Sequence, residues 1–314
     1  MTLAFVFPGQ GAQTIGMGRD LAEAYPAARA VFDEVDDALG EKLSALIWEG
    51  EQDQLTLTEN AQPALMATSM AALRALEAEG ISIADVSYVA GHSLGEYSAL
   101  CAAGTFSVAD TARLLRRRGK AMQAAVRVGD GAMAAILGLG IDDVRAIAEE
   151  AAQGAVCAAA NDNDPGQVVV SGHLQAVERA AALAKERGAK RALMLPVSAP
   201  FHCDLMEPAA REMASALSEV VMNDPSVPVV ANVLARPCSV ATDISSLLVE
   251  QVTHSVRWRE SVDWMATDGG VTAFWEIGAG KALSGMIRRI AKGAETRAVG
   301  TAADVAGAVE AMKG

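Results

Sequence analysis

The chain has 314 residues, of which 51% are hydrophobic and 21% are charged, and its formal net charge is −13. This length can form one large domain or two smaller ones. The acidity argues against a general role on nucleic acid or on an anionic membrane, so we expect neither as a partner and attribute the charge to solubility.

The four cysteines form neither a C-x-x-C pair nor a zinc-finger spacing with histidine; they are Cys101, Cys157, Cys203 and Cys238. They are typical of buried thiols in a reducing compartment, and no metal site is predicted. The first residues lack the basic region of a secretory signal, and no apolar run is long enough to span a bilayer. We therefore expect a cytoplasmic protein, with a monomer as its default state.

Short apolar runs alternate with helical periods along most of the chain, which predicts an α/β fold with a largely parallel sheet. A long helix is expected over Gln62–Glu79, where Gly80 would act as its C-cap. The expected strands of the main sheet are Leu3–Phe7, Val86–Ala90, Val227–Asn232 and Val271–Ile277.

A G-x-S-x-G pattern follows the second of these strands, at Gly91-His92-Ser93-Leu94-Gly95. A helix is expected directly after it, over Glu96–Ala103. A sharp turn from strand to helix would expose the hydroxyl of Ser93, and the helix N-terminus would offer free N–H groups to an oxyanion. The pattern predicts a serine nucleophile, although a simple strand–helix connection would also fit it.

The next helix is predicted over Ala109–Val126, with Ser107 as its N-cap and Asp110 completing a capping box. Helical periodicity places Arg118 on the apolar stripe, whereas its charged neighbours lie on the opposite face. A guanidinium that points inward must be paired. Its partner would be either an internal carboxylate or a carboxylate of the substrate.

A segment of roughly Gly129 to Val197 has the order β-α-β-β-α-β, which is ferredoxin-like. Its expected elements are Ala132–Leu139, Asp142–Ala152, Val156–Ala160, Gln167–Ser171, Gln175–Arg187 and Arg191–Val197, with a turn over 161–166. We therefore expect residues 129–197 to form an inserted subdomain, and residues 1–128 and 198–314 to form the larger body.

A serine nucleophile needs a base, and the chain has four histidines. His92 adjoins the serine and would point away from it, and His173 lies inside the insert. The residues alone leave His202 and His254 nearly tied.

These segments together resemble the malonyl-CoA:acyl-carrier-protein transacylase family, the FabD-type enzymes of bacterial fatty-acid synthesis. The resemblance runs nearly end to end and is carried by the segments at 7–11, 91–96, 118–122, 131–135, 165–169, 201–203 and 276–278. It implies an α/β-hydrolase-like body with a parallel sheet and an inserted ferredoxin-like small subdomain.

The resemblance also implies a role for each matching residue. Ser93 would be the nucleophile and His202 the general base, oriented by a main-chain carbonyl at Gln251 instead of a triad acid. Arg118 would bind the malonyl carboxylate. The remaining implied roles are the oxyanion hole, formed by the N–H groups of Gln10 and Leu94, and the wall of the acyl pocket at Met122.

Two positions depart from common members of the family. Ala12 stands where many members have serine, and we expect no effect. Phe201 stands where the best-known bacterial members have serine, and resembles the malonyl-selective domains of polyketide synthases. Phe201 and Leu94 would both favour malonyl over methylmalonyl.

The implied reaction is a ping-pong transfer of malonyl from malonyl-CoA to the phosphopantetheine thiol of acyl carrier protein, without a metal or redox cofactor. Basic residues that could dock the carrier are Arg116, Arg117, Lys185, Arg187, Lys190, Arg191, Arg288 and Arg289. Three alternatives remain: an esterase that uses His254, a non-catalytic carrier-binding subunit, and a transacylase that serves polyketide synthesis.

Overall fold

The computed structural model describes residues 2–197 and 199–313. A six-stranded sheet in the order β10-β9-β1-β2-β7-β8 forms the centre of the larger body. All neighbouring strands in it are parallel except β7 and β8. Its strands are β1 (Leu3–Phe7), β2 (Tyr88–Gly91), β7 (Val229–Ala231), β8 (Arg236–Cys238), β9 (Ala273–Ile277) and β10 (Glu295–Val299).

Every residue of β1 is buried, as expected for a strand at the centre of a parallel sheet with both faces covered. Leu3, Phe5 and Phe7 contribute to the core on one face. Ala4 and Val6 point the other way, because successive side chains alternate along a strand, and they pack in a separate core.

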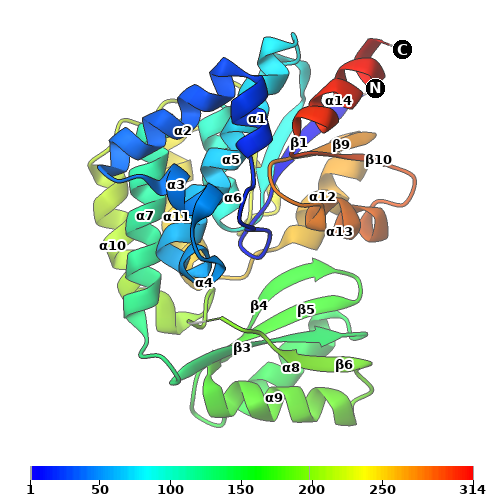
Figure 1. The fold of residues 1–314 in the computed structure, drawn as a ribbon. Helices are drawn as coiled ribbons and strands as arrows, with labels where there is room; N and C mark the ends of the chain where they lie inside the picture. The colour runs from blue at the N-terminus through cyan, green and yellow to red at the C-terminus, as the bar shows by residue number, and fades with distance from the viewer. Residues whose placement is uncertain (1, 198, 314) are drawn as a thin grey trace.

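Helices cover both faces of this sheet (Figure 1). The core that contains Phe5 is formed with α1 (Arg19–Ala24), α2 (Pro26–Leu39), α3 (Leu43–Glu49), α4 (Gln52–Thr56), α5 (Thr58–Ala78), α6 (Leu94–Ala102), α7 (Val108–Ala125), α10 (Glu207–Ser218), α11 (Ala241–Thr253) and α14 (Ala302–Lys313). The core that contains Val6 is formed with α12 (Trp258–Thr267) and α13 (Ala282–Ile290). Two short 3-10 helices, η1 (Ile83–Asp85) and η2 (Asp204–Met206), lie in the connections.

A second sheet of four antiparallel strands, in the order β4-β5-β3-β6, lies beside the larger body. Two helices cover the face of this sheet that points away from the body (Figure 1). Its elements are β3 (Gly131–Leu137), α8 (Ile141–Ala152), β4 (Cys157–Asp164), β5 (Gln167–His173), α9 (Leu174–Glu186) and β6 (Arg191–Met194). The predicted α/β class and the β-α-β-β-α-β order are confirmed.

One prediction within this segment is wrong. Residues 161–164 were expected in a turn, but they continue β4, and the turn is confined to Pro165 and Gly166. These four residues are buried, and partners from the larger body bind the side chains of Asp162, Asn163 and Asp164. Asp162 forms a salt bridge with Arg259 at 2.8 Å, and Asp164 forms one with Arg289 at 2.7 Å.

The main chain of β4 also binds the larger body, since the N–H of Asp162 donates to the carbonyl of Val256 at 2.9 Å. The domain limits at 128/129 and 197/198 stay a prediction, and residue 198 lies outside the described residues. Within the described ranges, no helix is both long and apolar enough to cross a membrane.

Candidate active site

Ser93 stands at a sharp turn between β2 and α6, with backbone angles φ 54° and ψ −110°. A non-glycine residue at positive φ is strained, and such strain is typical of functional sites. The turn is tight: a Cβ on Gly91 would overlap the main-chain carbonyl of Gly95, and a Cβ on Gly95 would overlap the carbonyl of Phe7. Both glycines of the G-x-S-x-G pattern are therefore required by the close approach of the backbone.

Asn232, which follows β7, holds this turn. Its Oδ1 accepts a hydrogen bond from the N–H of Ser93 at 2.8 Å, and its Nδ2 donates to the carbonyl of Gly91 at 2.7 Å. The side chain is fully buried. The sequence carried no signal for this role, because Asn232 reaches Ser93 only through the pairing of β2 with β7.

His202 lies against the serine. Its Nε2 is 2.7 Å from Ser93 Oγ, and its Nδ1 is 2.8 Å from the main-chain carbonyl oxygen of Gln251. A carbonyl oxygen only accepts, so Nδ1 carries the proton and Nε2 presents a lone pair to the hydroxyl. The three residues thus form a serine–histidine–carbonyl chain suited to removing the hydroxyl proton.

The imidazole of His202 is held in its neutral form. Burial, and then the positive charge of Arg118, lower the pKa of His202 to about 3. A neutral imidazole is the form that can accept the proton of Ser93.

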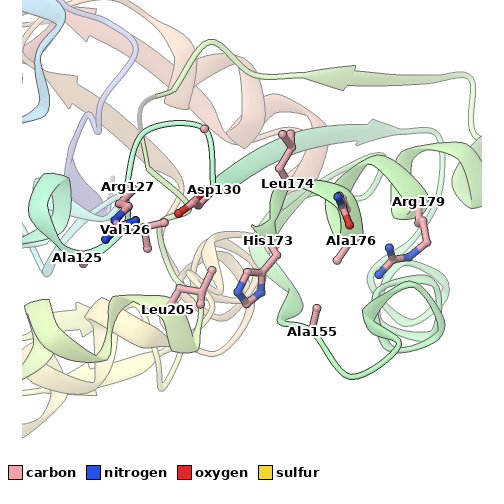
Figure 2. Close-up of a pocket in the computed structure, with 12 residues that line it drawn as sticks. Ala125, Val126, Arg127, Asp130, Ala155, His173, Leu174, Ala176, Arg179 and Leu205 are labelled. Atoms are coloured by element: carbon pink, nitrogen blue, oxygen red, sulfur yellow. The ribbon is translucent and has the colours of Figure 1, made fainter.

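The other histidines have different surroundings. His254 is exposed, and its Nδ1 lies 3.1 Å from the carbonyl of Glu250. The Nε2 of His92 lies 2.8 Å from Asn163 Oδ1, which ties the turn at Ser93 to β4. His173 lines a separate cavity of about 580 Å³ (Figure 2), where its Nδ1 accepts from the N–H of Val156. Of the four histidine side chains, only that of His202 lies within hydrogen-bond distance of Ser93 Oγ.

Arg118 points inward from α7 and is 1% exposed, as the helical periodicity predicted. Its Nη1 donates to Gln62 Oε1 at 2.8 Å, and its Nη2 donates to Gln251 Oε1 at 2.9 Å and to Ser93 Oγ at 3.2 Å. The guanidinium also lies 5.5 Å from the ring of Tyr97. Among the described residues no carboxylate forms a salt bridge with it, so an internal acidic partner, one of the two predicted alternatives, is not found.

Glu96 and Gln62 belong to this cluster but were not singled out in the sequence. Glu96 is 2% exposed, and its Oε2 accepts from Gln251 Nε2 at 2.7 Å and from the N–H of Asn232 at 3.2 Å. Burial raises the pKa of Glu96 to about 7, against the opposing effects of these hydrogen bonds and of Arg118. Its position three residues after Ser93, in the first turn of α6, was the one available signal.

A cavity of about 510 Å³ opens above Ser93 between the two sheets. The larger body contributes the loop after β1, the turn at Ser93, α7 and α13, and the small sheet contributes β3, β4 and β5. The predicted site residues on its wall are Gln10, Ser93, Leu94, Arg118, Met122, Phe201 and His202. Gln251 is fully buried behind Arg118 and is not part of the wall.

Gln10 and Leu94 reach this cavity from different elements. Gln10 lies in the loop after β1, which packs against the turn: a Cβ on Gly9 would come within 2.7 Å of the carbonyl oxygen of His92. Leu94 begins α6, so its N–H has no acceptor within the helix. In the described part of the chain, no group of three or more His, Cys, Asp or Glu side chains is arranged to hold a metal ion.

Comparison with known proteins gives the same family along the whole chain. Residues 4–310 match the acyl transferase domain family. The chain is 46% identical over 312 residues to the malonyl CoA-acyl carrier protein transacylase of Bacillus subtilis, covering 99% of this chain and 97% of that protein. The structure resembles an acyl-carrier-protein S-malonyltransferase from Bartonella henselae, with 56% identity, a TM-score of 0.97 and 100% of both chains covered.

A second similar structure is a malonyl-transacylase in complex with a type II PKS acyl-carrier protein. The match has 43% identity and a TM-score of 0.96, and it covers 99% of this chain and 100% of that one.

Proposed function

This chain belongs to the malonyl-CoA:acyl-carrier-protein transacylase family of acyl transferases, and from that membership we propose that Ser93 and His202 carry the malonyl group in two half-reactions. Malonyl-CoA and acyl carrier protein are its substrates. We propose that the enzyme supplies fatty-acid synthesis.

In the first half-reaction, Ser93 Oγ attacks the thioester carbonyl of malonyl-CoA while His202 Nε2 takes its proton. The 2.7 Å distance between these atoms supports this role. The tetrahedral intermediate collapses, the C–S bond breaks, and the imidazolium returns the proton to the CoA thiolate. A malonyl-serine ester remains, and the phosphopantetheine thiol of the carrier then attacks it by the reverse sequence.

The oxyanion of each tetrahedral intermediate would bind the main-chain N–H groups of Gln10 and Leu94. The N–H of Leu94, which stands at the start of α6 and has no acceptor within the helix, supports this assignment, since a helix N-terminus also provides positive potential. The wall formed by Met122, Leu94 and Phe201 would enclose the acyl chain.

The observation that carries the proposal is the pairing of Arg118. Its guanidinium is buried beside Ser93 and binds only neutral oxygens of Gln62, Gln251 and Ser93, without a salt bridge among the described residues. A buried cation favours a carboxylate strongly because few other groups compensate its charge. The malonyl carboxylate would supply that charge at the end of the acyl group opposite the thioester.

The exposed His254 gives no support to an esterase with a late histidine. A non-catalytic carrier-binding subunit is excluded if malonyl becomes bound to Ser93. We expect incubation with malonyl-CoA to add the mass of one malonyl group, and peptide mapping to locate it on Ser93. Ser93→Ala should acquire no adduct, and an adduct retained on that variant would contradict the proposal.

The carrier would dock beside β6. Four of the basic candidates bind acidic residues: Arg116 binds Glu41, Arg117 binds Glu212 and Glu219, Arg187 binds Glu150, and Arg289 binds Asp164. Lys190 and Arg191 are exposed and form no salt bridge in the ranges that the structure covers. The chain continues from them through β6 into Leu195, Pro196 and Val197, which line the cavity.

Charge reversal tests this docking surface. Lys190→Glu with Arg191→Glu should raise the KM for the carrier and leave the KM for malonyl-CoA unchanged, because a carrier with an acidic surface would be repelled. Arg19→Glu with Arg29→Glu changes the charge equally on α1 and α2, far from β6 (Figure 1). An equal rise of the carrier KM in both double variants would reject the docking surface.

A further inference from the structure

We infer that Glu96 is a positioning residue for acyl selectivity: it fixes the side-chain amide of Gln251, which in turn orients Arg118 for a carboxylate-bearing acyl group. This inference rests on the proposed function of Arg118.

The side-chain amide of Gln251 lies between hydrogen-bond acceptors on one side and a hydrogen-bond donor, the guanidinium of Arg118, on the other. Its Nε2 donates to Glu96 Oε2 at 2.7 Å and to the main-chain carbonyl of Ser93 at 3.0 Å. Its Oε1 accepts from Arg118 Nη2 at 2.9 Å. A rotated amide would set an NH2 group against the guanidinium and an oxygen against a carboxyl and a carbonyl. Glu96 therefore favours one of the two orientations, the one that holds Arg118.

Gln251 is also the residue whose main-chain carbonyl accepts from His202 Nδ1 at 2.8 Å. Glu96 thus acts on one residue that contacts both the base and the guanidinium. It supports the serine turn as well, because Oε2 accepts from the N–H of Asn232, whose side chain binds Ser93 and Gly91.

Glu96 itself does not reach the substrate. It is 2% exposed and is not among the residues that line the cavity. It forms no salt bridge among the described residues, and burial raises its pKa to about 7. A buried carboxyl that is costly to ionise and lies in an active site is a candidate for a functional role. Any effect of Glu96 on acyl selectivity must then pass through its hydrogen-bond partners, Gln251 and Asn232.

The test measures the ratio of malonyl to acetyl kcat/KM, together with Tm. Glu96→Ala removes the acceptor, and Glu96→Met removes it while nearly keeping the volume. We expect either variant to lower the ratio about tenfold, in the range usual for coupled neighbours. Glu96→Gln retains one oxygen that can accept from Gln251 Nε2, so its ratio should stay close to that of the parent.

A double-mutant cycle separates positioning from general damage. If Glu96 acts through Gln251, Glu96→Ala with Gln251→Ala should lower the ratio no further than Gln251→Ala alone. Asp36→Ala is the matched control, since Asp36 is a buried carboxyl on α2 that binds Ser44 away from the cavity. It should lower Tm and leave the ratio unchanged.

Two results would overturn the inference: an unchanged ratio in both Glu96→Ala and Glu96→Met, or a double variant whose loss is the product of the single losses. Arg118→Ala serves as the reference. If that variant leaves the ratio unchanged, the proposed clamp itself fails; if it changes the ratio and the Glu96 variants do not, only the positioning role fails.

Discussion

The Nδ1 atom of His202 lies 2.8 Å from the main-chain carbonyl oxygen of Gln251, where a serine triad would have a carboxylate. A carbonyl fixes the tautomer as a carboxylate does, but it offers no full charge to stabilise the imidazolium. The positive charge of Arg118 acts in the opposite sense and, after burial, contributes to the low pKa of His202. Removal of the proton from Ser93 is therefore coupled to what occupies Arg118.

Replacement of the two candidate bases should have very different effects. His202→Ala should lower kcat for malonyl transfer by about 10³-fold, since the only imidazole within reach of Ser93 is lost. His254→Ala should change kcat little, because that side chain is exposed and bonded locally. Steady-state kcat values would decide which histidine is the base, provided that both variants keep the Tm of the parent. Equal losses of kcat in both variants would contradict the assignment.

Arg118→Ala should lower malonyl transfer by about 10²-fold while acetyl transfer holds or rises. In the parent, an acetyl group leaves the buried guanidinium without a carboxylate, and removal of the guanidinium removes that penalty. Arg117→Ala is the control on the same helix, because Arg117 pairs at the surface with Glu212 and Glu219. Competition between the two CoA thioesters measures the change. Equal losses for both acyl groups would refute the carboxylate clamp.

The parts of the site that could be predicted from the sequence are those set by local geometry. Gly91 and Gly95 indicated the turn because only glycine permits such close backbone contacts. The inward position of Arg118 followed from helical periodicity. Both signals act within a few residues of the side chain concerned.

The remaining parts depend on contacts distant in sequence. Asn232 binds the turn across 139 positions, and no local pattern marks it. The choice between His202 and His254 needed the family resemblance, because the path of the chain decides which one reaches Ser93. Asp162 and Asp164 were assigned to a turn on local propensity, but their bonds to Arg259 and Arg289 allow these polar residues to lie in a buried strand.

Gly91→Ala should prevent stable folding or lower Tm sharply, since the added methyl would overlap the backbone at Gly95. Gly140→Ala is the matched control: a Cβ there has no neighbour within 4 Å, and φ is −81°. The soluble yield and the Tm of the two variants would be measured against those of the parent. A Gly91→Ala protein with the Tm of the parent would contradict the tight turn.

Phe201 lines the cavity and packs on the inner face of the small sheet, against Met133, Ala135, Ala160 and Val169. Phe201→Ala should raise the rate with methylmalonyl-CoA relative to malonyl-CoA, about tenfold, because space opens for one methyl group. Val128→Ala, at an exposed position, should leave the ratio as it is. If Phe201→Ala left the ratio of the methylmalonyl-CoA rate to the malonyl-CoA rate unchanged, another residue would have to exclude the methyl branch.

The titration of His202 tests the coupling between base and guanidinium. In the free protein its pKa is lowered to about 3, first by burial and then by Arg118. Arg118→Ala removes the second cause and leaves the first, so the pKa should rise but stay below the ordinary value of about 6.5. NMR of the imidazole would follow this directly, and an unchanged pKa would contradict the coupling.

The same shift has a consequence for stability. The unfolded chain takes up a proton on this histidine as the pH falls through about 6.5, whereas the folded protein does so only near pH 3. His202 therefore makes folding less favourable as the pH falls across that window. His202→Asn should lose less stability than the parent between those pH values, and urea unfolding at several pH values would measure the difference. Parallel pH profiles for the two proteins would mean that His202 is not held neutral in the folded state.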